Sequence, residues 1–111
     1  MANTQKEQAP YVIIWEFYVK SGEESRFEQV YGPRGDWARL FSQGEGYLGT
    51  QLLRDAQKKG RYFTVDAWVS PAAYESFRKR HAEEYKTLDE KCEALTVRET
   101  PLGAFLRLGP Q

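Results

Sequence analysis

The sequence predicts an α+β domain of the ferredoxin-like class, in which two helical segments cover one face of an antiparallel sheet. Stretches rich in β-branched and aromatic residues alternate with stretches of helical periodicity in the order β-α-β-β-α-β. The 111 residues suffice for one such domain and leave no room for a second. The third candidate strand, 61–69, has one apolar face and one mixed face, as expected when helices cover only one side of a sheet.

The first predicted elements are a strand and an interrupted helix. Residues 11–20, YVIIWEFYVK, are apolar on both faces, which predicts a strand in the centre of the sheet. A helical period starts near Glu23, and the run GPRG at 32–35 must split this helix because glycine and proline both oppose a helix interior. Asp36 can cap the second, shorter piece.

The rest of the chain supplies a hairpin, a second helix and a last strand. Residues 47–55 and 61–69 predict two strands, and a last extended segment continues after Pro101. Ser70 is a good N-cap and Pro71 a good first helical residue, so we expect a helix to begin there. The apolar stripe of this helix, at spacings of three and four, consists of Tyr74, Phe77, His81, Tyr85, Leu88 and Cys92.

Charge and cysteine content restrict the class of function. Sixteen acidic residues balance sixteen basic ones, so no net field attracts nucleic acid or an anionic membrane. The single cysteine, Cys92, excludes an internal disulfide and a multi-cysteine metal site. Residues 1–10 lack the apolar core of a signal peptide and are expected to be a disordered tail before one domain at 11–108. We therefore expect a cytoplasmic protein without a nucleic-acid or membrane partner.

The two faces of the third strand lead to a prediction about assembly. The apolar face consists of Phe63, Val65, Ala67 and Val69, and the mixed face of Tyr62, Thr64, Asp66 and Trp68. One layer of helices covers only one face, so we expect a second copy to cover the apolar one, giving a homodimer formed sheet against sheet. The mixed face then lies under the helices, where incomplete filling would leave a cavity for a small aromatic ligand.

Three titratable side chains are candidates for the chemistry of such a cavity. A carboxylate on a covered strand costs several kcal/mol unless it is paired, and Arg54 on the neighbouring strand is a candidate partner for Asp66. If Asp66 faces a cavity instead, its pKa rises and it becomes a candidate general base. Glu16 on the first strand raises the same question. His81, the only histidine, is either a core residue or a second candidate base.

Several runs of the chain resemble antibiotic biosynthesis monooxygenase (ABM) domains. The matching runs are GYLGTQLLRD at 46–55, RYFTVDAW at 61–68 and EYKTLDEKCEALT at 84–96. The resemblance extends from Tyr11 to Phe105, and YGPRGDWARLF at 31–41 is typical of one subgroup. It implies a dimeric α+β barrel, in agreement with the expected homodimer.

The resemblance also implies a reaction. Characterised members that act on aromatic polyketides oxidise phenolic rings to quinones with molecular oxygen and use no metal, haem or flavin. The deprotonated substrate itself donates the electron to oxygen. The chain is therefore expected to be a cofactor-independent monooxygenase, with a phenolic or polycyclic aromatic substrate and O2 as co-substrate.

The resemblance extends to individual site residues. In those enzymes a Trp on the third strand and a Tyr six residues later line the site, and Trp68 and Tyr74 match that spacing. With Asp66 and His81 as candidate bases, these four are the predicted catalytic residues. The predicted substrate-binding residues are Trp15, Tyr62, Thr64 and Phe77. Thr64 stands where the family has a hydrogen-bonding Asn, and Leu88 occupies the region of the family's pocket Arg.

Two alternative functions are compatible with the same pattern. One is a non-catalytic, dimeric protein that binds a small ligand or is associated with stress, and that keeps the fold without the Asn. The other follows a branch of the superfamily that degrades haem with an Asn on the first strand, the same Trp and a His on the second helix. Here Trp15 stands at the position of that Asn, and His81 lies thirteen residues after Trp68, about one helical turn beyond the usual spacing.

Overall fold

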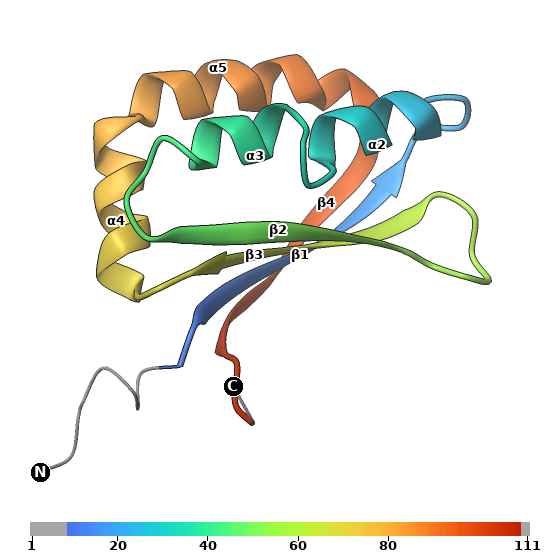
Figure 1. Ribbon diagram of the computed structural model, residues 1–111. Coiled ribbons are helices and arrows are strands. Elements are labelled where there is room, and N and C mark those ends of the chain that lie inside the picture. Colours follow the sequence, from blue (N-terminus) through green and yellow to red (C-terminus); the bar gives the residue numbers. More distant parts are fainter. Residues whose placement is uncertain (1–8, 110–111) are drawn as a thin grey trace, which may run out of the picture.

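The computed structural model describes residues 9–109, which form one antiparallel sheet with the helices on one side (Figure 1). Of the expected tail at 1–10, residues 1–8 lie outside the described part. The elements are β1 (Tyr11–Val19), α2 (Glu24–Tyr31), α3 (Asp36–Phe41), β2 (Tyr47–Arg54), β3 (Arg61–Trp68), α4 (Pro71–Arg80), α5 (Ala82–Cys92), a 3₁₀ turn (Glu93–Leu95) and β4 (Thr96–Leu106). This is the predicted β-α-β-β-α-β order, with each helical segment divided into two pieces.

The sheet has the strand order β2-β3-β1-β4, and all three pairings are antiparallel. The prediction that the first strand is central is confirmed, since β1 pairs with both β3 and β4. Pro101 lies inside β4, which tolerates a residue without an N–H because it is an edge strand. The ladder between β1 and β4 shifts register between Ile14 and Trp15, next to this proline.

The predicted division of the first helical segment is confirmed. α2 ends at Tyr31, and α3 begins at Asp36. Gly35 packs so closely that an added Cβ atom would lie 2.3 Å from the carbonyl oxygens of Gln29 and Val30. The prediction that Asp36 caps α3 is wrong by one position, because Gly35 is the N-cap and Asp36 is the first helical residue.

The second helical segment begins as predicted but does not continue as one helix. The Ser70 hydroxyl accepts a 3.1 Å hydrogen bond from the Ala73 N–H, and Pro71 is the first helical residue. His81, with φ −118° and ψ 32°, leaves the helical conformation and separates α4 from α5. The two helices therefore run in different directions, with α4 rising from the end of β3 and α5 lying over the sheet (Figure 1).

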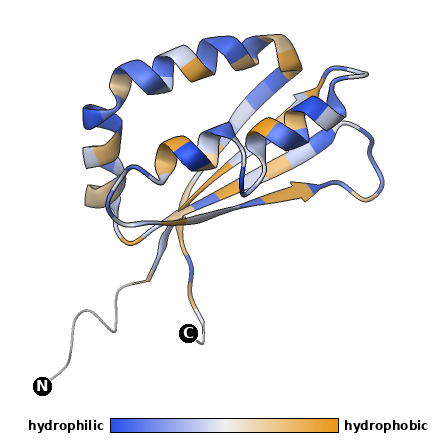
Figure 2. Cartoon of the chain, turned by 45° about the horizontal axis from the view of Figure 1, so that its top comes forward, coloured by the Kyte–Doolittle hydropathy of each residue, from blue (hydrophilic) through white to orange (hydrophobic). Residues whose placement is uncertain are grey.

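The core between helices and sheet is mainly aromatic. Its largest fully buried side chains are Trp68, Tyr62, Phe27 and Phe77. Burying one such ring contributes about 2 kcal/mol or more to folding. The outer surface of the helices is mostly hydrophilic, whereas the strands carry hydrophobic residues at intervals (Figure 2). In the described part of the chain no helix is both long and apolar enough to cross a membrane.

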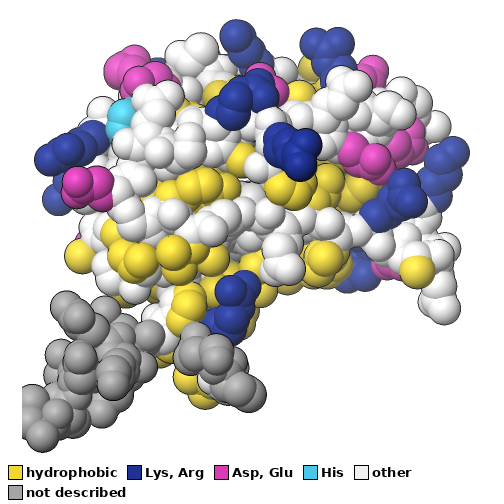
Figure 3. Space-filling model, in the orientation of Figure 1, with side chains coloured by type: hydrophobic (Ala, Val, Ile, Leu, Met, Phe, Trp, Pro, Cys, Tyr) yellow, Lys and Arg dark blue, Asp and Glu magenta, His cyan; other side chains and the backbone are white. Residues whose placement is uncertain are grey.

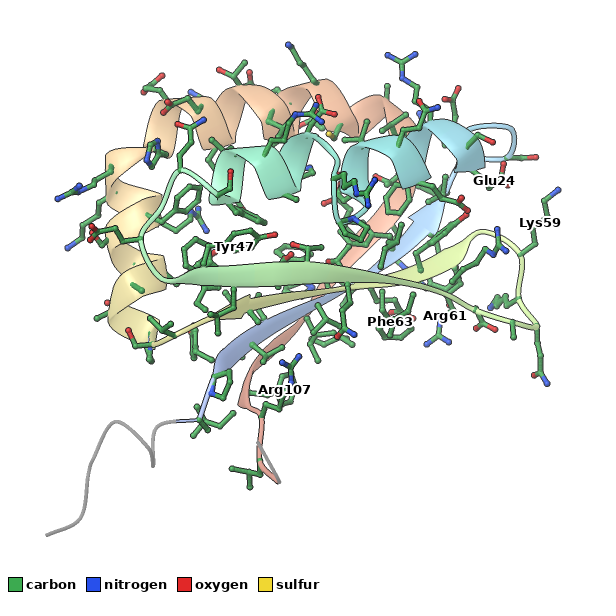
Figure 4. The ribbon with its side chains drawn as sticks, in the orientation of Figure 1. Glu24, Tyr47, Lys59, Arg61, Phe63 and Arg107 are labelled. Atoms are coloured by element: carbon green, nitrogen blue, oxygen red, sulfur yellow. The ribbon has the colours of Figure 1, made fainter. Side chains whose placement is uncertain are left out.

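The two faces of the sheet are occupied as the sequence predicts. Tyr47 of β2 lies between the sheet and α3, whereas Arg61 and Phe63 of β3 lie on the opposite side (Figure 4). No described helix covers that opposite face, which we call the outer face. Large apolar side chains that are between 42 and 54% exposed include Leu48, Leu53, Val69 and Phe105. Hydrophobic side chains gather over the sheet in Figure 3, and charged ones gather mostly over the helices.

The apolar residues predicted on β3 differ in exposure within a single chain. Phe63 and Val65 are half-buried, and Val69 is exposed. Ala67, expected in the same apolar face, is already buried in the single chain at 6% exposure. Glu16, whose pairing the sequence left open, forms a 2.7 Å ion pair with Arg61.

Candidate functional site

A cavity of about 100 Å³ lies between the helices and the sheet. Its lining residues are Trp15, Phe17, Tyr31, Trp37, Phe41, Thr50, Thr64, Asp66, Tyr85, Asp89 and Glu99. All four strands and α2, α3 and α5 contribute to this wall, whereas α4 contributes nothing. An apolar cavity of about 150 Å³ holds one benzene ring, so this cavity is smaller than the space that one ring requires.

Asp66 lies at the inner end of a short chain of hydroxyl groups. The Thr50 hydroxyl donates a 2.6 Å hydrogen bond to Asp66 Oδ1. Thr50 Oγ1 lies 2.6 Å from the Tyr47 hydroxyl, and Tyr47 donates in this bond because Thr50 has only one proton to give. Burial raises the pKa of Asp66 to about 6, and the bond from Thr50 opposes part of that rise.

The predicted partner of Asp66 pairs elsewhere. Arg54 Nη1 lies 3.1 Å from Glu28 Oε2, so the expected ion pair between Arg54 and Asp66 is wrong. Asp66 instead lines the cavity, and burial raises its pKa, as in the alternative expectation. Asp66 is therefore a carboxyl group that changes its charge close to neutral pH.

Two further carboxyl groups border the cavity. Glu99 on β4 is half-buried, and burial raises its pKa despite a 3.0 Å hydrogen bond from the Thr96 hydroxyl. The charge of Asp89 on α5 also raises the pKa of Glu99, so the two groups are near enough to repel. Asp89 is exposed, which means that the cavity reaches solvent beside it. None of the lining residues is a lysine, arginine or histidine.

Aromatic rings form most of the remaining wall. Trp15 stacks on Phe17 with 6.2 Å between ring centroids, and Trp37 meets Tyr85 edge-on at 4.9 Å. The indole N–H groups of Trp37 and Trp68 are buried without a hydrogen bond of good geometry within the described residues, but that of Trp37 lies close enough to the Tyr31 hydroxyl and the Cys92 thiol to oppose part of the rise in their pKa.

Three of the predicted site residues line this cavity. They are Asp66 and Thr64 on β3 and Trp15 on β1. Successive side chains of a strand alternate between faces, so Thr64 and Asp66 are brought to the same side. Trp15 is directly opposite Thr64 in the β1–β3 ladder, which adds it to that side of the sheet.

Trp68, Tyr74 and Phe77 lie in a neighbouring aromatic cluster. The Trp68 ring is fully buried and lies 5.5 Å from the Tyr74 ring and 5.2 Å from the Phe77 ring. None of the three lines the cavity. Phe41 lines the cavity and also meets Trp68 at 5.8 Å, so it connects the two groups of rings.

His81 and Tyr62 also lie outside the cavity lining. His81 stacks on Phe77 at 5.0 Å, and its Nδ1 lies 3.4 Å from Glu84 Oε2. It borders a surface groove between α4 and the loop before β2. The buried Tyr62 donates a 2.5 Å hydrogen bond to Glu28 Oε2.

Sequence reasoning missed most of the cavity wall. The missed residues are Phe17, Tyr31, Trp37, Phe41, Thr50, Tyr85, Asp89 and Glu99. Tyr85 lies on the predicted apolar stripe of the second helical segment, and this position could have identified it as a residue that faces the sheet. Thr50 could be found only from the register of β2 against β3, where it is opposite Asp66.

The fold corresponds to a known class of small domains. The chain belongs to the antibiotic biosynthesis monooxygenase family, whose sequence pattern matches residues 10–89. This confirms the family resemblance of the sequence, and the ferredoxin-like fold agrees with it. No curated protein is similar enough in sequence to count as a relative.

Solved structures of the same fold come from several bacteria. SnoaB, a cofactor-independent oxygenase from Streptomyces nogalater, has a TM-score of 0.72 at 19% identity, over 92% of this chain and 96% of its own. A protein from Pseudomonas aeruginosa has a TM-score of 0.65 at 18% identity, over 91% and 96%. A protein from Shewanella oneidensis has a TM-score of 0.61 at 17% identity, over 90% and 92%. At these identities the similarity establishes the fold alone.

Proposed function

We propose that this protein is a cofactor-independent monooxygenase that oxidises a single phenolic ring with O2. The observation that carries the proposal is Asp66, a carboxyl group with a pKa of about 6 that faces a cavity of about 100 Å³ between the helices and the sheet. A general base works best when its pKa lies near the working pH. Family membership and the fold shared with SnoaB, a cofactor-independent oxygenase, support the reaction class.

In the proposed reaction Asp66 takes the proton of the phenolic hydroxyl group. The phenolate passes one electron to O2, and the resulting radical pair combines at a ring carbon. Loss of water then leaves a carbonyl at that carbon, so that one C–H bond and one O2 give a quinone oxygen and one water molecule. The net charge of the Asp66–substrate pair does not change during proton transfer, which limits the cost of the step in a buried site.

Several residues would hold the ring and its oxygen atom. Trp15 and the other aromatic side chains supply flat walls, and Thr64 offers a hydroxyl in place of the family's Asn. We propose that Trp68 and Tyr74 act on the site through packing, because the Trp68 ring meets Phe41 in the cavity wall.

The size of the cavity favours a single ring over a polycyclic substrate. About 100 Å³ is smaller than the roughly 150 Å³ that accommodates benzene in a dry cavity. One ring would require a small movement of the aromatic side chains in the wall, and several fused rings a much larger one. The same limit opposes the haem alternative, since a haem does not fit this volume and His81 does not line it.

We also propose that the protein is a homodimer joined through the outer face. Exposed Leu53 and Phe105 and half-buried Val65 lie on the side of the sheet that lacks helices. A contiguous apolar surface of this kind is uncommon on monomers, and a second copy offers the same chemistry in return.

Oxygen uptake tests the proposed function directly. The purified protein should consume O2 with simple phenols, at a rate that rises with pH through about 6 as Asp66 ionises. Asp66→Asn should abolish this uptake, while His81→Ala, outside the cavity, should keep most of it. Loss of uptake in His81→Ala with normal uptake in Asp66→Asn would assign the base to the histidine. No uptake with any phenol would favour a ligand-binding protein without catalysis.

A further inference from the structure

We infer that Tyr47 is a redox-active tyrosine, which gives up an electron and a proton to quench peroxyl radicals that escape productive reaction in the cavity. The source of these radicals is the proposed reaction of the substrate with O2, so this role rests on the proposed function. It requires an electron path from Tyr47 to the cavity and an acceptor for the proton of its hydroxyl group.

The ring of Tyr47 lies one layer behind the cavity wall. It contacts Phe41, which lines the cavity, with 5.7 Å between ring centroids, and Trp68 at 5.3 Å. Its hydroxyl group is hydrogen-bonded to Thr50, which also lines the cavity, whereas Tyr47 itself does not. An electron of this ring can therefore reach a radical in the cavity across a single side chain.

The proton of Tyr47 has an acceptor to which it is already connected. Tyr47 donates to Thr50 Oγ1, and Thr50 donates to Asp66 Oδ1, each over 2.6 Å. A tyrosine that loses an electron becomes a very strong acid, so it is oxidised readily only where its proton can leave in the same step. Burial raises the pKa of Asp66, which makes its carboxylate a better acceptor for that proton.

The step balances with the chemistry proposed for the cavity. The electron of Tyr47 reduces a peroxyl radical to a peroxide anion, and Asp66 gives this anion the proton that it took from the substrate. Thr50 then passes its own proton to Asp66 and takes that of Tyr47. One peroxyl radical and one tyrosine thus become a hydroperoxide and a neutral tyrosyl radical, with no change in net charge.

Three other tyrosines near the cavity are less suited to give up an electron. The hydroxyl of Tyr74 accepts a 2.8 Å hydrogen bond from the Arg78 guanidinium, and the same guanidinium lies 3.8 Å over the ring of Tyr85. A cation at these distances opposes the removal of an electron from a ring. The hydroxyl of the buried Tyr31 lies next to the Cys92 thiol, a weaker proton acceptor than a carboxylate. Charge and hydrogen bonding thus favour the tyrosine of β2.

Trp68 can relay oxidation from the rest of the aromatic core to Tyr47. Its buried indole N–H has no hydrogen bond within residues 9–109. An oxidised indole that cannot release its proton remains a strong oxidant, so it takes an electron from the neighbouring Tyr47. Tyr47 is half-buried on the edge strand β2, where a soluble reductant such as a thiol can restore it.

Pulse radiolysis without oxygen tests the inference without any turnover. Azide radicals oxidise tryptophan side chains first, and transfer to a tyrosine is followed by the growth of tyrosyl radical absorption. We expect Tyr47→Phe to remove most of this tyrosyl radical, and heavy water to slow its formation in the native protein. Thr50→Val and Asp66→Asn should each slow it at least about fivefold, because the proton loses its acceptor.

Tyr18→Phe is the matched control for loss of a tyrosine hydroxyl. Tyr18 is half-buried on β1, and the cations of Lys58 and Arg98 lie over its ring at 5.0 and 4.5 Å. Its replacement should leave the yield of tyrosyl radical unchanged. Circular dichroism of each variant checks that the fold is retained.

Two results would overturn the inference. One is an undiminished yield of tyrosyl radical in Tyr47→Phe, above all if the yield falls in Tyr74→Phe instead. The other is a rate of formation that neither Thr50→Val nor Asp66→Asn changes. Oxygen uptake with phenols is measured separately. Uptake without a radical at Tyr47 would refute the inference alone, and a radical at Tyr47 without uptake would support the redox site while refuting the proposed oxygenase.

Discussion

Thr50 lies directly opposite Asp66 in the β2–β3 ladder, and its hydroxyl donates a 2.6 Å hydrogen bond to Asp66 Oδ1. The cross-strand pair places a titratable carboxyl in the wall of the cavity and ties one of its oxygens to the neighbouring strand. The Tyr47 hydroxyl extends the same chain of bonds. The protonation of Asp66 is therefore coupled to two side chains of β2. Substitutions at Asp66 and on that strand can test this coupling.

Replacing Asp66 by asparagine should stabilise the protein at high pH and not at low pH. The pKa of Asp66 is about 6 in the folded protein against 3.8 for the ordinary carboxyl. Ionised Asp66 therefore lowers the free energy of unfolding above pH 6, and this cost disappears as the pH falls from 6 to 4. The gain in Asp66→Asn should be at most about 3 kcal/mol at pH 8 and close to zero at pH 4, measured by urea unfolding. A gain of equal size at both values would contradict the raised pKa.

Replacing Thr50 by valine should raise the pKa of Asp66 further. The Thr50 hydroxyl stabilises the ionised carboxyl, and valine has nearly the same shape without a donor. The midpoint of the pH dependence of oxygen uptake should move upward by about one pH unit. Thr87→Val, on the exposed side of α5, is the matched control and should leave the midpoint unchanged. An unchanged midpoint in Thr50→Val would remove Thr50 from the site.

A charge on the outer face should prevent association of two chains. We expect the native protein to have twice the chain mass of 12.9 kDa in light scattering. Val65→Lys should give single chains, because the lysine would be buried without a partner between two sheets. Ala82→Lys, exposed on the helical side, should remain dimeric. A native protein with the mass of one chain would exclude the proposed dimer.

Replacing Gly35 by alanine should destabilise the fold without changing the chemistry of the site. The added Cβ would lie 2.3 Å from two backbone carbonyl oxygens of α2, which cannot move aside without distorting that helix. We expect a loss of about 1–3 kcal/mol in the free energy of unfolding. Arg34→Ala, at the exposed neighbouring position, should cost much less. A tolerated alanine at Gly35 would mean that the turn between α2 and α3 can relax.

The backbone plan could be predicted because each part of it depends on local signals. Ser70 followed by Pro71 marks the start of α4, and Gly32 and Gly35 divide the first helical segment. The alternation along β3 assigns Asp66 to the covered face without knowledge of any contact. These features require only the geometry of a strand or of a helix end.

The cavity wall could not be predicted because it depends on how separate elements meet. Trp68 occupies the predicted family position, yet Phe41 from α3 packs against it and lines the cavity in its place. His81 lies on an unbroken stripe in the sequence, and only its backbone conformation reveals that the helix ends there. The bond between Thr50 and Asp66 depends on a register that shifts between Tyr47 and Gly49.

The change of direction at His81 divides the second helical segment into two parts with separate tasks. α4 carries Phe77 into the aromatic cluster around Trp68, and α5 carries Tyr85 and Asp89 to the cavity. If the cavity binds the proposed substrate, substitutions at Tyr85 and Asp89 should change which molecule is accepted while the packing of Phe77 stays intact. Within this segment only α5 reaches the cavity wall, although its Cys92 also belongs to the core.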